Sequence, residues 1–435
     1  MNRTAGLLLV LILLAPIIGA QEPASPLTMD QAVQTALSSN LAIRIARDDA
    51  SAARARIGAA KSALYPDISA SAQYTRLSKV PSVTIPASGG NPPETIAIST
   101  KQNVVGTIAT RLAIYTGGRI SALISKAEAM YDLSVARLGV TEAQVALQTR
   151  EVYYGMLLAQ SLVKSAEQSL TAAKDQLKTA TDRFEIGTAA RFDVLRAQTQ
   201  VSEAEQTLTE ARNQVQTAQV ALDRILGFPL DKPLALGEPA AAPQTSEDLS
   251  ALIATANQHR GELLAAKAQV AAVKSGIRLA ASEYLPQLGL SANYQTVAQE
   301  TPTQTTGWTF MAIASMDIFN GGRAGFDLAE AKALRAEAEA NLHDTSRGVE
   351  QDVRQSYLNL QTARQTIETA KSRLAQASEA YDVATVRYQA GVGTATEVAD
   401  ALAALTGART NLDRATFNYS TAYARLQRAL GNTEY

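Results

Sequence analysis

A long repeat of small and apolar residues constrains the fold of this chain more than any other feature. Within residues 353–388 such residues recur at alternating steps of three and four, with no proline between them. The series is Val353, Ser356, Leu360, Ala363, Ile367, Ala370, Leu374, Ala377, Tyr381, Ala384 and Tyr388. A repeat of this spacing, sustained for about five heptads, forms the seam of a coiled coil. The sequence therefore predicts a long helix that needs a partner along its whole length.

The chain also contains an internal duplication. Residues 156–184 carry the same seam 204 positions earlier, and the register holds from the turn at 116–119, matched by 320–323, to the end of a return helix. Before the expected strands the two copies align at an offset of 220, as Pro66 and Pro286 show. Such self-similarity means that one structural unit is used twice. Each unit is predicted to supply two antiparallel long helices, and the extra residues of the first copy belong to the loop 78–102.

Four segments of alternating character lie between the helices, two in each repeat. Residues 67–77, 103–115, 287–297 and 308–318 alternate side chains with period two, which is typical of strands. About ten residues is the length of a tilted strand that crosses a membrane. Four strands do not close on themselves, and open edges are not tolerated in lipid, so a membrane sheet requires several copies of the chain. An ordinary soluble sheet with two hairpins is the alternative.

The predicted fold is therefore mainly α-helical with a small strand part, in which long antiparallel coiled-coil helices are combined with four strands. The expected divisions are a signal peptide at 1–20, repeat 1 at 21–227, a proline-rich linker at 228–245, repeat 2 at 246–431 and a C-terminal tail at 432–435. Helices are expected at 28–64, 119–184 and 191–226 in repeat 1, and at 246–284, 323–388 and 395–430 in repeat 2.

The first twenty residues have the pattern of a secretory signal. Arg3 precedes an apolar run at 7–14, and Ile-Gly-Ala at 18–20 provides a cleavage site. A transmembrane anchor is the alternative, although Pro16 and Gly19 interrupt the run. After residue 20 no apolar stretch is long enough to span a bilayer as a helix.

Composition excludes several classes of protein. The net charge is −1 and 19% of the residues are charged, without the basic patch that a nucleic-acid surface requires. There is no cysteine, so disulfides and thiolate metal sites are excluded, and the two histidines, His259 and His343, lack ligand spacing. No nucleophile elbow, phosphate-binding loop or dinucleotide fingerprint occurs. We therefore expect neither an enzyme nor a cofactor.

Two duplicated motifs give the chain a family resemblance. The first is the strand-to-helix turn, Thr-Gly-Gly-Arg at 116–119 and Asn-Gly-Gly-Arg at 320–323. The second is the tip of the helical hairpin, which begins Arg-Phe-x-x-Gly at 183 and Arg-Tyr-x-x-Gly at 387. In both motifs the chain resembles the outer-membrane efflux proteins, the TolC-like exit ducts, over essentially its whole mature length. The resemblance implies a homotrimer in the outer membrane of a Gram-negative bacterium, with a twelve-strand β-barrel in lipid continuous with an α-barrel in the periplasm.

The resemblance also implies a gate at the second tip. Glu397 and Asp400 match two acidic residues that line the narrow periplasmic end in the family. Three copies would form a ring of six carboxylates, which selects for cations. Without the resemblance, helix capping and a solvated surface would account for both residues.

Further tip residues match the family's closed-state latch and its docking surface. Asp193 and Tyr388 fall on latch positions, but the arginine of that latch is Gly393 here, so closure is expected to be weaker or to use Arg191 or Arg196. The resemblance implies that the tips contact a periplasmic adaptor protein and, through it, an inner-membrane pump. The implied contact residues are Arg183, Gly187, Arg387 and Gly391, the glycines being turn residues in their own right.

The predicted function is a passive exit duct of a tripartite efflux or type I secretion system, gated at the periplasmic tips. The alternative is a structural coiled-coil envelope protein without a channel, which the strand pairs argue against. A secreted hydrolase, a third class, has no candidate catalytic group. No pocket chemistry in the expected duct wall indicates the cargo.

Overall fold

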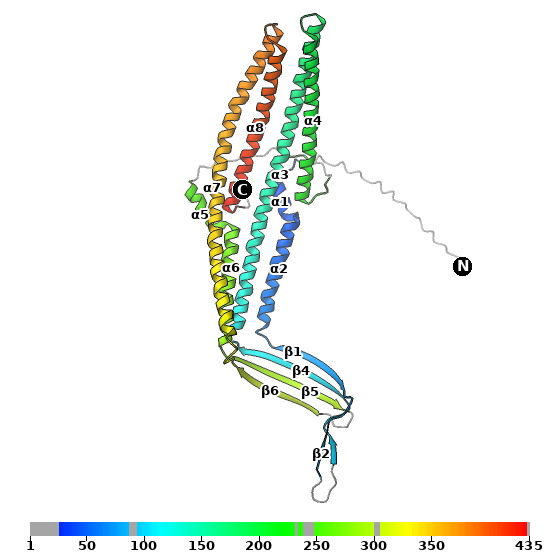
Figure 1. Cartoon of the computed structure of the whole chain (residues 1–435), viewed down its shortest axis with the longest axis vertical. Helices are drawn as coiled ribbons and strands as arrows, with labels where there is room; N and C mark the ends of the chain where they lie inside the picture. Colours follow the sequence, from blue (N-terminus) through cyan, green and yellow to red (C-terminus); the bar gives the residue numbers. More distant parts are fainter. Residues whose placement is uncertain (1–25, 87–93, 231–233, 238–247, 300–304, 433–435) are drawn as a thin grey trace, which may run out of the picture.

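The computed structural model describes residues 26–86, 94–230, 234–237, 248–299 and 305–432. It is an elongated and mainly helical molecule, with the strands gathered at one end (Figure 1). The expected signal peptide at 1–20 lies outside the described residues, as do parts of the linker and of the tail.

Both repeats contain two shorter helices, two strands of the main sheet and two long helices in the same order, and repeat 1 adds β2 and β3 whereas repeat 2 adds η1. Repeat 1 consists of α1 (Met29–Ser39), α2 (Leu41–Ser62), β1 (Asp67–Arg76), β2 (Ser82–Ile85), β3 (Glu94–Ala97), β4 (Gln102–Tyr115), α3 (Arg119–Glu185) and α4 (Arg191–Leu226). Repeat 2 consists of α5 (Leu249–His259), α6 (Gly261–Ala281), the 3-10 turn η1 (Ser282–Tyr284), β5 (Gln287–Gln299), β6 (Thr305–Ser315), α7 (Arg323–Gln389) and α8 (Ala395–Leu430).

The helices α3 and α7 run the whole length of the helical part. Each has 67 residues, which corresponds to about 100 Å at 1.5 Å per residue. The halves distant from the sheet pair with α4 and α8, and the halves near the sheet lie beside α2 and α6 (Figure 1). The seam predicted from the sequence lies at these contacts, where Ala166 packs against Leu208 and Ala211. Among the described residues, no helix combines the length and the apolar run needed to cross a membrane.

The largest apolar clusters lie near the middle of the long helices, one in each repeat. In repeat 1, α1 packs on α3 and α4 around Tyr153, Met156 and Leu222. The Tyr153 side chain is fully buried, and its hydroxyl donates to the carbonyl oxygens of Leu27 at 2.7 Å and Gly237 at 2.8 Å. Burial raises the pKa of Tyr153, although the hydrogen bond to Gly237 acts in the opposite direction. These contacts attach the chain before α1 and the chain after α4 to the same helix.

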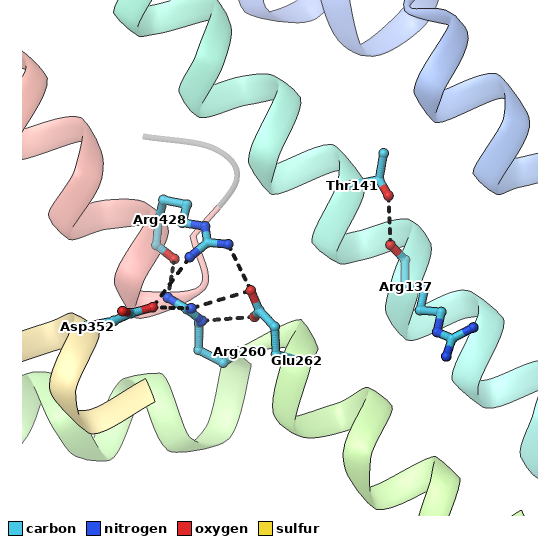
Figure 2. A network of polar contacts seen from close by, with 6 residues as sticks. All are labelled: Arg137, Thr141, Arg260, Glu262, Asp352 and Arg428. Carbon is cyan, nitrogen blue, oxygen red and sulfur yellow. Dashed lines mark hydrogen bonds and ion pairs between the residues drawn. The ribbon is translucent and has the colours of Figure 1, made fainter. Parts of the chain in front are cut away.

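Repeat 2 has, in addition to its apolar cluster, a cluster of charges at the junction of its helices (Figure 2). The charge cluster consists of Arg260 between α5 and α6, Glu262 on α6, Asp352 on α7 and Arg428 on α8. Arg260, only 4% exposed, donates to Glu262 and Asp352 at 2.9 Å each and to the carbonyl oxygen of Arg428 at 3.3 Å. Arg428 donates to Glu262 at 2.9 Å. The cluster therefore joins four helices of one repeat.

Glycine pairs make the turns from strand to long helix. Gly117 and Gly118 have φ of 60° and 86°, and Gly321 and Gly322 have φ of 69° and 86°. Residues with a Cβ rarely adopt this left-handed conformation. A Cβ at Gly117 would also lie 2.6 Å from the Cβ of Leu285. The Gly-Gly-Arg motif is therefore required by the sharp change of direction between each strand and its helix.

The sheet joins the two repeats. Its order is β1-β4-β5-β6, all antiparallel, and the central pair β4–β5 brings Ile108 opposite Tyr294. Directly paired residues point to the same face of a sheet. The register therefore collects on one face a set of large exposed side chains: Ile68, Tyr74, Val104, Ile108, Leu288, Leu290, Tyr294, Trp308 and Phe310. The other face carries mainly Ser, Thr, Asn and Gln.

Two features of the strands differ from the sequence prediction. The fourth strand was expected at 308–318 but covers Thr305–Ser315, because its partner β5 begins at Gln287, opposite Ser315, directly after Pro286, which has no N–H to donate. The loop 78–102, to which the sequence prediction assigned no strand, contains the short ribbon β2–β3, in which Val83 pairs with Ile96. Pro81 and Pro86 flank the first strand of this ribbon, so the short alternation of its residues was not recognised as a strand.

Candidate functional site: the tips of the helical hairpins

The two hairpin tips lie at the end of the molecule opposite the sheet (Figure 1). Each helix ends in a left-handed glycine, with φ of 77° at Gly187 and 79° at Gly391. The N–H of each glycine donates to a carbonyl oxygen of the last helical turn, that of Phe184 in the first tip and that of Tyr388 in the second, at 3.0 Å. This geometry accounts for the two glycines as turn residues. A Cβ at Gly391 would lie 3.4 Å from the guanidinium of Arg183.

The two expected gate acids lie in the first turns of α8. Thr394 caps this helix by accepting a hydrogen bond from the N–H of Glu397 at 3.2 Å. The Glu397 carboxylate lies 3.8 Å from Arg387, which belongs to the same hairpin. Asp400 is one helical turn further, is 76% exposed, and lies 4.0 Å from Arg196 of the other hairpin. Each acid thus has a guanidinium partner, but the two partners come from different hairpins.

Tyr388 is joined to the first tip by Arg183. Its side chain is 4% exposed and packs against Val398. The guanidinium of Arg183 lies 4.7 Å from the centre of the Tyr388 ring and donates to the Tyr388 carbonyl oxygen at 2.6 Å. A cation over an aromatic ring is an attractive contact. Arg183, expected only as a docking residue, thus also links the tips.

Asp193, the other expected latch residue, is engaged in its own helix. Its carboxylate accepts a hydrogen bond from the N–H of Ala190 at 3.3 Å, which closes the first turn of α4. Among the described residues of this single chain, no hydrogen bond joins Asp193 to Tyr388.

Position 393 of the second tip is packed closely against the end of α7. A Cβ added to Gly393 would lie 3.0 Å from the backbone nitrogen of Tyr388 and 3.1 Å from the carbonyl carbon of Arg387. The N–H of Gly393 donates to the carbonyl oxygen of Arg387 at 3.0 Å. A side chain at this position would therefore require the end of α7 to shift by a few tenths of an ångström.

Where the family has a latch arginine this chain has Gly393, and Arg196 contacts the second tip instead. Its guanidinium donates to the hydroxyl of Thr396 at 2.6 Å as well as approaching Asp400. The sequence left Arg191 and Arg196 as alternatives, and only Arg196 has such a contact among the described residues. Thr396 was not expected to take part, since a threonine near a helix start normally signals only capping.

Polar contacts join the two hairpins at several levels, beside small apolar residues such as Ala173 and Ala399. Going from the middle of the molecule to the tips, Arg425 donates to Glu151 at 2.7 Å, Ser165 to Asp413 at 3.2 Å, and the hydroxyls of Ser169 and Thr406 lie 2.9 Å apart. The Arg425–Glu151 contact is exposed, whereas the two nearer the tips are part-buried.

Large apolar side chains are exposed around both turns. Those of the first tip are Phe184, Ile186, Phe192 and Leu195, and those of the second are Val386 and Val392. A gathering of exposed apolar residues at the end of an elongated protein is typical of an interaction surface. No group of three or more His, Asp or Glu side chains within the described residues could hold a metal ion.

The fold is that of an elongated, two-repeat protein in which paired long helices are joined to one small sheet. The chain belongs to the outer membrane efflux protein family, whose pattern matches residues 32–228 and 252–432. It is therefore an outer-membrane protein of Gram-negative bacteria that extends into the periplasm, from a family of transport channels rather than of enzymes.

The chain is similar to the following relatives over most of its length. Outer membrane protein TolC of Escherichia coli is 24% identical over 416 residues, covering 92% of this chain and 81% of TolC. The probable efflux pump outer membrane protein TtgC of Pseudomonas putida is 23% identical, covering 94% of this chain and 83% of TtgC. The crystal structure of the outer membrane protein VceC of Vibrio cholerae superposes with a TM-score of 0.78 at 18% identity, covering 93% of this chain and 96% of VceC.

Proposed function

We propose that the protein is a passive exit duct, assembled from three copies, that opens and closes at the periplasmic helix tips. The observation that carries the proposal is the tip itself, where two acids one helical turn apart meet arginines from both hairpins. In this proposal Glu397 and Asp400 of three copies form a ring of carboxylates that selects for cations. The chain contributes no enzymatic step, and energy for transport comes from its partners.

The open edges of the sheet support assembly with further copies. Within the described residues, β1 and β6 each pair on one side only, so both edges present unpaired backbone groups. Three sheets of four strands joined edge to edge would close into one cylinder of twelve strands, which removes these edges. The continuous apolar face of the sheet suits contact with outer-membrane lipid. The long helices would then continue the cylinder as a helical tube.

The exposed apolar tips support docking to a periplasmic adaptor protein, which connects the duct to an inner-membrane pump. Arg183, Gly187, Arg387 and Gly391 lie in these turns, among the exposed apolar side chains. Asp193 and Tyr388 are proposed to strengthen the closed state when copies assemble. Within one chain, Arg183 and Arg196 provide the links.

Bilayer recordings test this function directly. We expect the assembled protein to conduct, and the double substitution Glu397→Ala/Asp400→Ala to reduce its preference for cations, because the ring loses its negative charge. The matched control Asp48→Ala/Asp49→Ala removes two exposed acids from α2, far from the tips, and should leave selectivity unchanged. Unchanged selectivity in the tip variant would reject the acidic gate. A protein that never conducts would favour a structural envelope role instead.

A further inference from the structure

We propose that the polar face of the sheet carries a binding site for amphipathic organic anions, with Arg111 and Arg119 on its basic side and Met311 on its apolar side. The polar face is the one opposite the large apolar side chains described above. The inference rests on the proposed function, because this face lines the duct when three sheets close into a cylinder. It names a class of cargo that the duct wall would hold at its membrane end.

A pocket of about 580 Å³ lies on this face, over the part of the sheet that adjoins the long helices. The register places Arg111 of β4, Ser291 of β5 and Met311 of β6 in one row, so their side chains point to the same face. Because neighbouring strands are about 4.8 Å apart, the arginine and the methionine stand roughly 10 Å from each other. The pocket could not be recognised in the sequence, because its walls come from both repeats.

The basic side of the pocket has no acid to neutralise it. Within the described ranges no carboxylate lines the pocket, and neither Arg111 nor Arg119 takes part in an ion pair. Asp67 is opposite Arg111 in the register of β1 and β4, but it is not joined to Arg111 and does not line the pocket. Two guanidinium groups are therefore available to a negatively charged ligand.

The equivalent arginine of repeat 2 shows that this arrangement is particular to repeat 1. Arg323, the counterpart of Arg119 in the Gly-Gly-Arg turn, lies 3.8 Å from Glu283 and 4.0 Å from Asp327. In repeat 1 the residues equivalent to these two acids are uncharged, Ala63 and Leu123. The turn itself therefore does not require a free arginine, and the loss of both acids leaves Arg119 without a counter-ion in the pocket.

The floor of the pocket contains a polar atom that lacks a partner. The Ser291 hydroxyl is shielded from solvent, and no hydrogen bond to it exists among the residues that the structure describes. Buried hydroxyl groups in proteins almost always have a partner, because leaving one unpaired costs free energy. Ser291 stands between Arg111 and Met311 in the row. An anion oxygen that enters between these side chains would accept the missing hydrogen bond.

The opposite side of the pocket determines the class of anion. Met311 and Ile313 are 49% and 51% exposed, on a face that otherwise carries mainly short polar side chains. Guanidinium groups bind carboxylate, sulfonate or phosphate through paired hydrogen bonds. A ligand that has such a group and an apolar body would bury Met311 and Ile313 as well, whereas an inorganic anion would leave them exposed. The pocket therefore favours amphipathic anions.

The acids proposed for the tips do not act on this site. They lie at the opposite end of α3, which has 67 residues and is about 100 Å long (Figure 1). Charges in physiological salt are screened over about 8 Å. The preference of the tips among small ions and the binding of an anion at the sheet are therefore independent properties.

Binding of naphthalene-2-sulfonate to the assembled protein in phosphatidylcholine nanodiscs tests the site. Arg111→Gln should weaken binding by about tenfold or more, because a charge-assisted hydrogen bond is lost, and Arg111→Gln/Arg119→Gln should weaken it further. The matched control is Arg76→Gln, an arginine of β1 on the apolar face, which should bind as the unchanged protein does. Ser291→Ala should weaken binding several-fold without lowering the thermal midpoint of the free protein, because its hydroxyl has no partner there.

Ligands that lack one of the two parts test the proposed chemistry. Inorganic sulfate and naphthalene-2-methanol should each bind at least tenfold more weakly than naphthalene-2-sulfonate. Met311→Ser should weaken binding of naphthalene-2-sulfonate several-fold and leave that of sulfate unchanged. Phosphatidylglycerol added to the nanodiscs should not compete, because the pocket is on the face away from lipid.

Three results would overturn the site: unchanged affinity in Arg111→Gln, equal affinity for naphthalene-2-methanol, and competition by phosphatidylglycerol, which would make a lipid the occupant. Bilayer recordings separate these failures from a failure of the proposed function. Naphthalene-2-sulfonate should reduce the current through the unchanged protein and not through Arg111→Gln. A protein that binds the probe through Arg111 but never conducts would reject the duct and, with it, the role of this site in transport.

Discussion

Replacing Arg260 with alanine tests the charge cluster that joins four helices of repeat 2. The side chain is 4% exposed and makes hydrogen bonds to Glu262, Asp352 and the carbonyl oxygen of Arg428. Removing one partner of a fully buried ion pair costs about 3–5 kcal/mol, because the other charge is left uncompensated. Here the loss should be smaller, since Glu262 is 29% and Asp352 52% exposed, and Arg428 still pairs with both. We therefore expect a loss of about 2–3 kcal/mol.

Amide hydrogen exchange measures this loss locally, in the assembled protein. A destabilisation of about 2 kcal/mol corresponds to roughly 30-fold faster exchange in the affected segment. We expect this increase in α5 and the start of α6, with little change in α1 and α2. The matched control is Asn40→Ala at the equivalent position of repeat 1, where Asn40 caps α2 and donates to the carbonyl oxygen of Ile225 at 3.3 Å. Loss of that cap should cost about 1 kcal/mol.

The double substitution Arg260→Ala/Arg428→Ala provides the sharper comparison. It leaves two carboxylates without either guanidinium, so its effect should exceed the sum of the single effects. Additive effects, or exchange in α5 that rises less than about threefold in Arg260→Ala, would refute the reasoning.

Three further substitutions test the packing that positions the long helices. Tyr153→Phe should destabilise repeat 1 by about 1 kcal/mol in thermal unfolding, because the carbonyl oxygen of Gly237 loses its hydroxyl donor, whereas that of Leu27 keeps the N–H of Gly237; an unchanged midpoint would contradict this. Burial raises the pKa of Tyr153 above its ordinary value of 10.0. The stabilisation that the neutral hydroxyl provides is therefore complete below pH 10 and is lost as pH rises through the pKa of the folded state. The phenylalanine variant should not show this loss of stability at alkaline pH. Gly431→Ala should destabilise by more than about 1 kcal/mol, since the residue has φ of 87° and a Cβ would lie 2.7 Å from the carbonyl carbon of His259. Gly348→Ala, where a Cβ meets nothing within 4 Å inside α7, should instead stabilise by up to about 1 kcal/mol. Equal effects of the two glycine substitutions would show that the close contact at Gly431 is unimportant.

Local periodicity explains why so much of the fold could be read from the sequence. The seam of residues 353–388 repeats with the period of a helix, and α7 covers it without a break. The Gly-Gly-Arg turns need left-handed φ values that glycine adopts freely, so their positions were visible as well. These properties depend only on neighbouring residues, and the internal duplication repeats them in the second half of the chain.

The site could be predicted only in part. The tips and their two acids were found through the family pattern, whereas Arg183 over Tyr388 and Arg196 beside Thr396 and Asp400 were not assigned. The choice between Arg191 and Arg196 depends on which arginine of α4 faces the other hairpin. That orientation follows from how α3, α4 and α8 pack, and no spacing within the sequence contains it.

The sequence alone thus established two copies of a helical hairpin with a strand pair, because helix and strand periods are local and the duplication repeats them. Tertiary structure alone established how the copies meet, through β4 and β5 in the sheet and through polar contacts between the hairpins, and it alone showed the charge cluster around Arg260 within repeat 2. Many of these contacts join residues that are far apart in the sequence. The residue of repeat 1 equivalent to Arg260 is Asn40, so the charge cluster is not repeated there. Pairing between such distant segments is set by the packing of the whole chain, which no local pattern records.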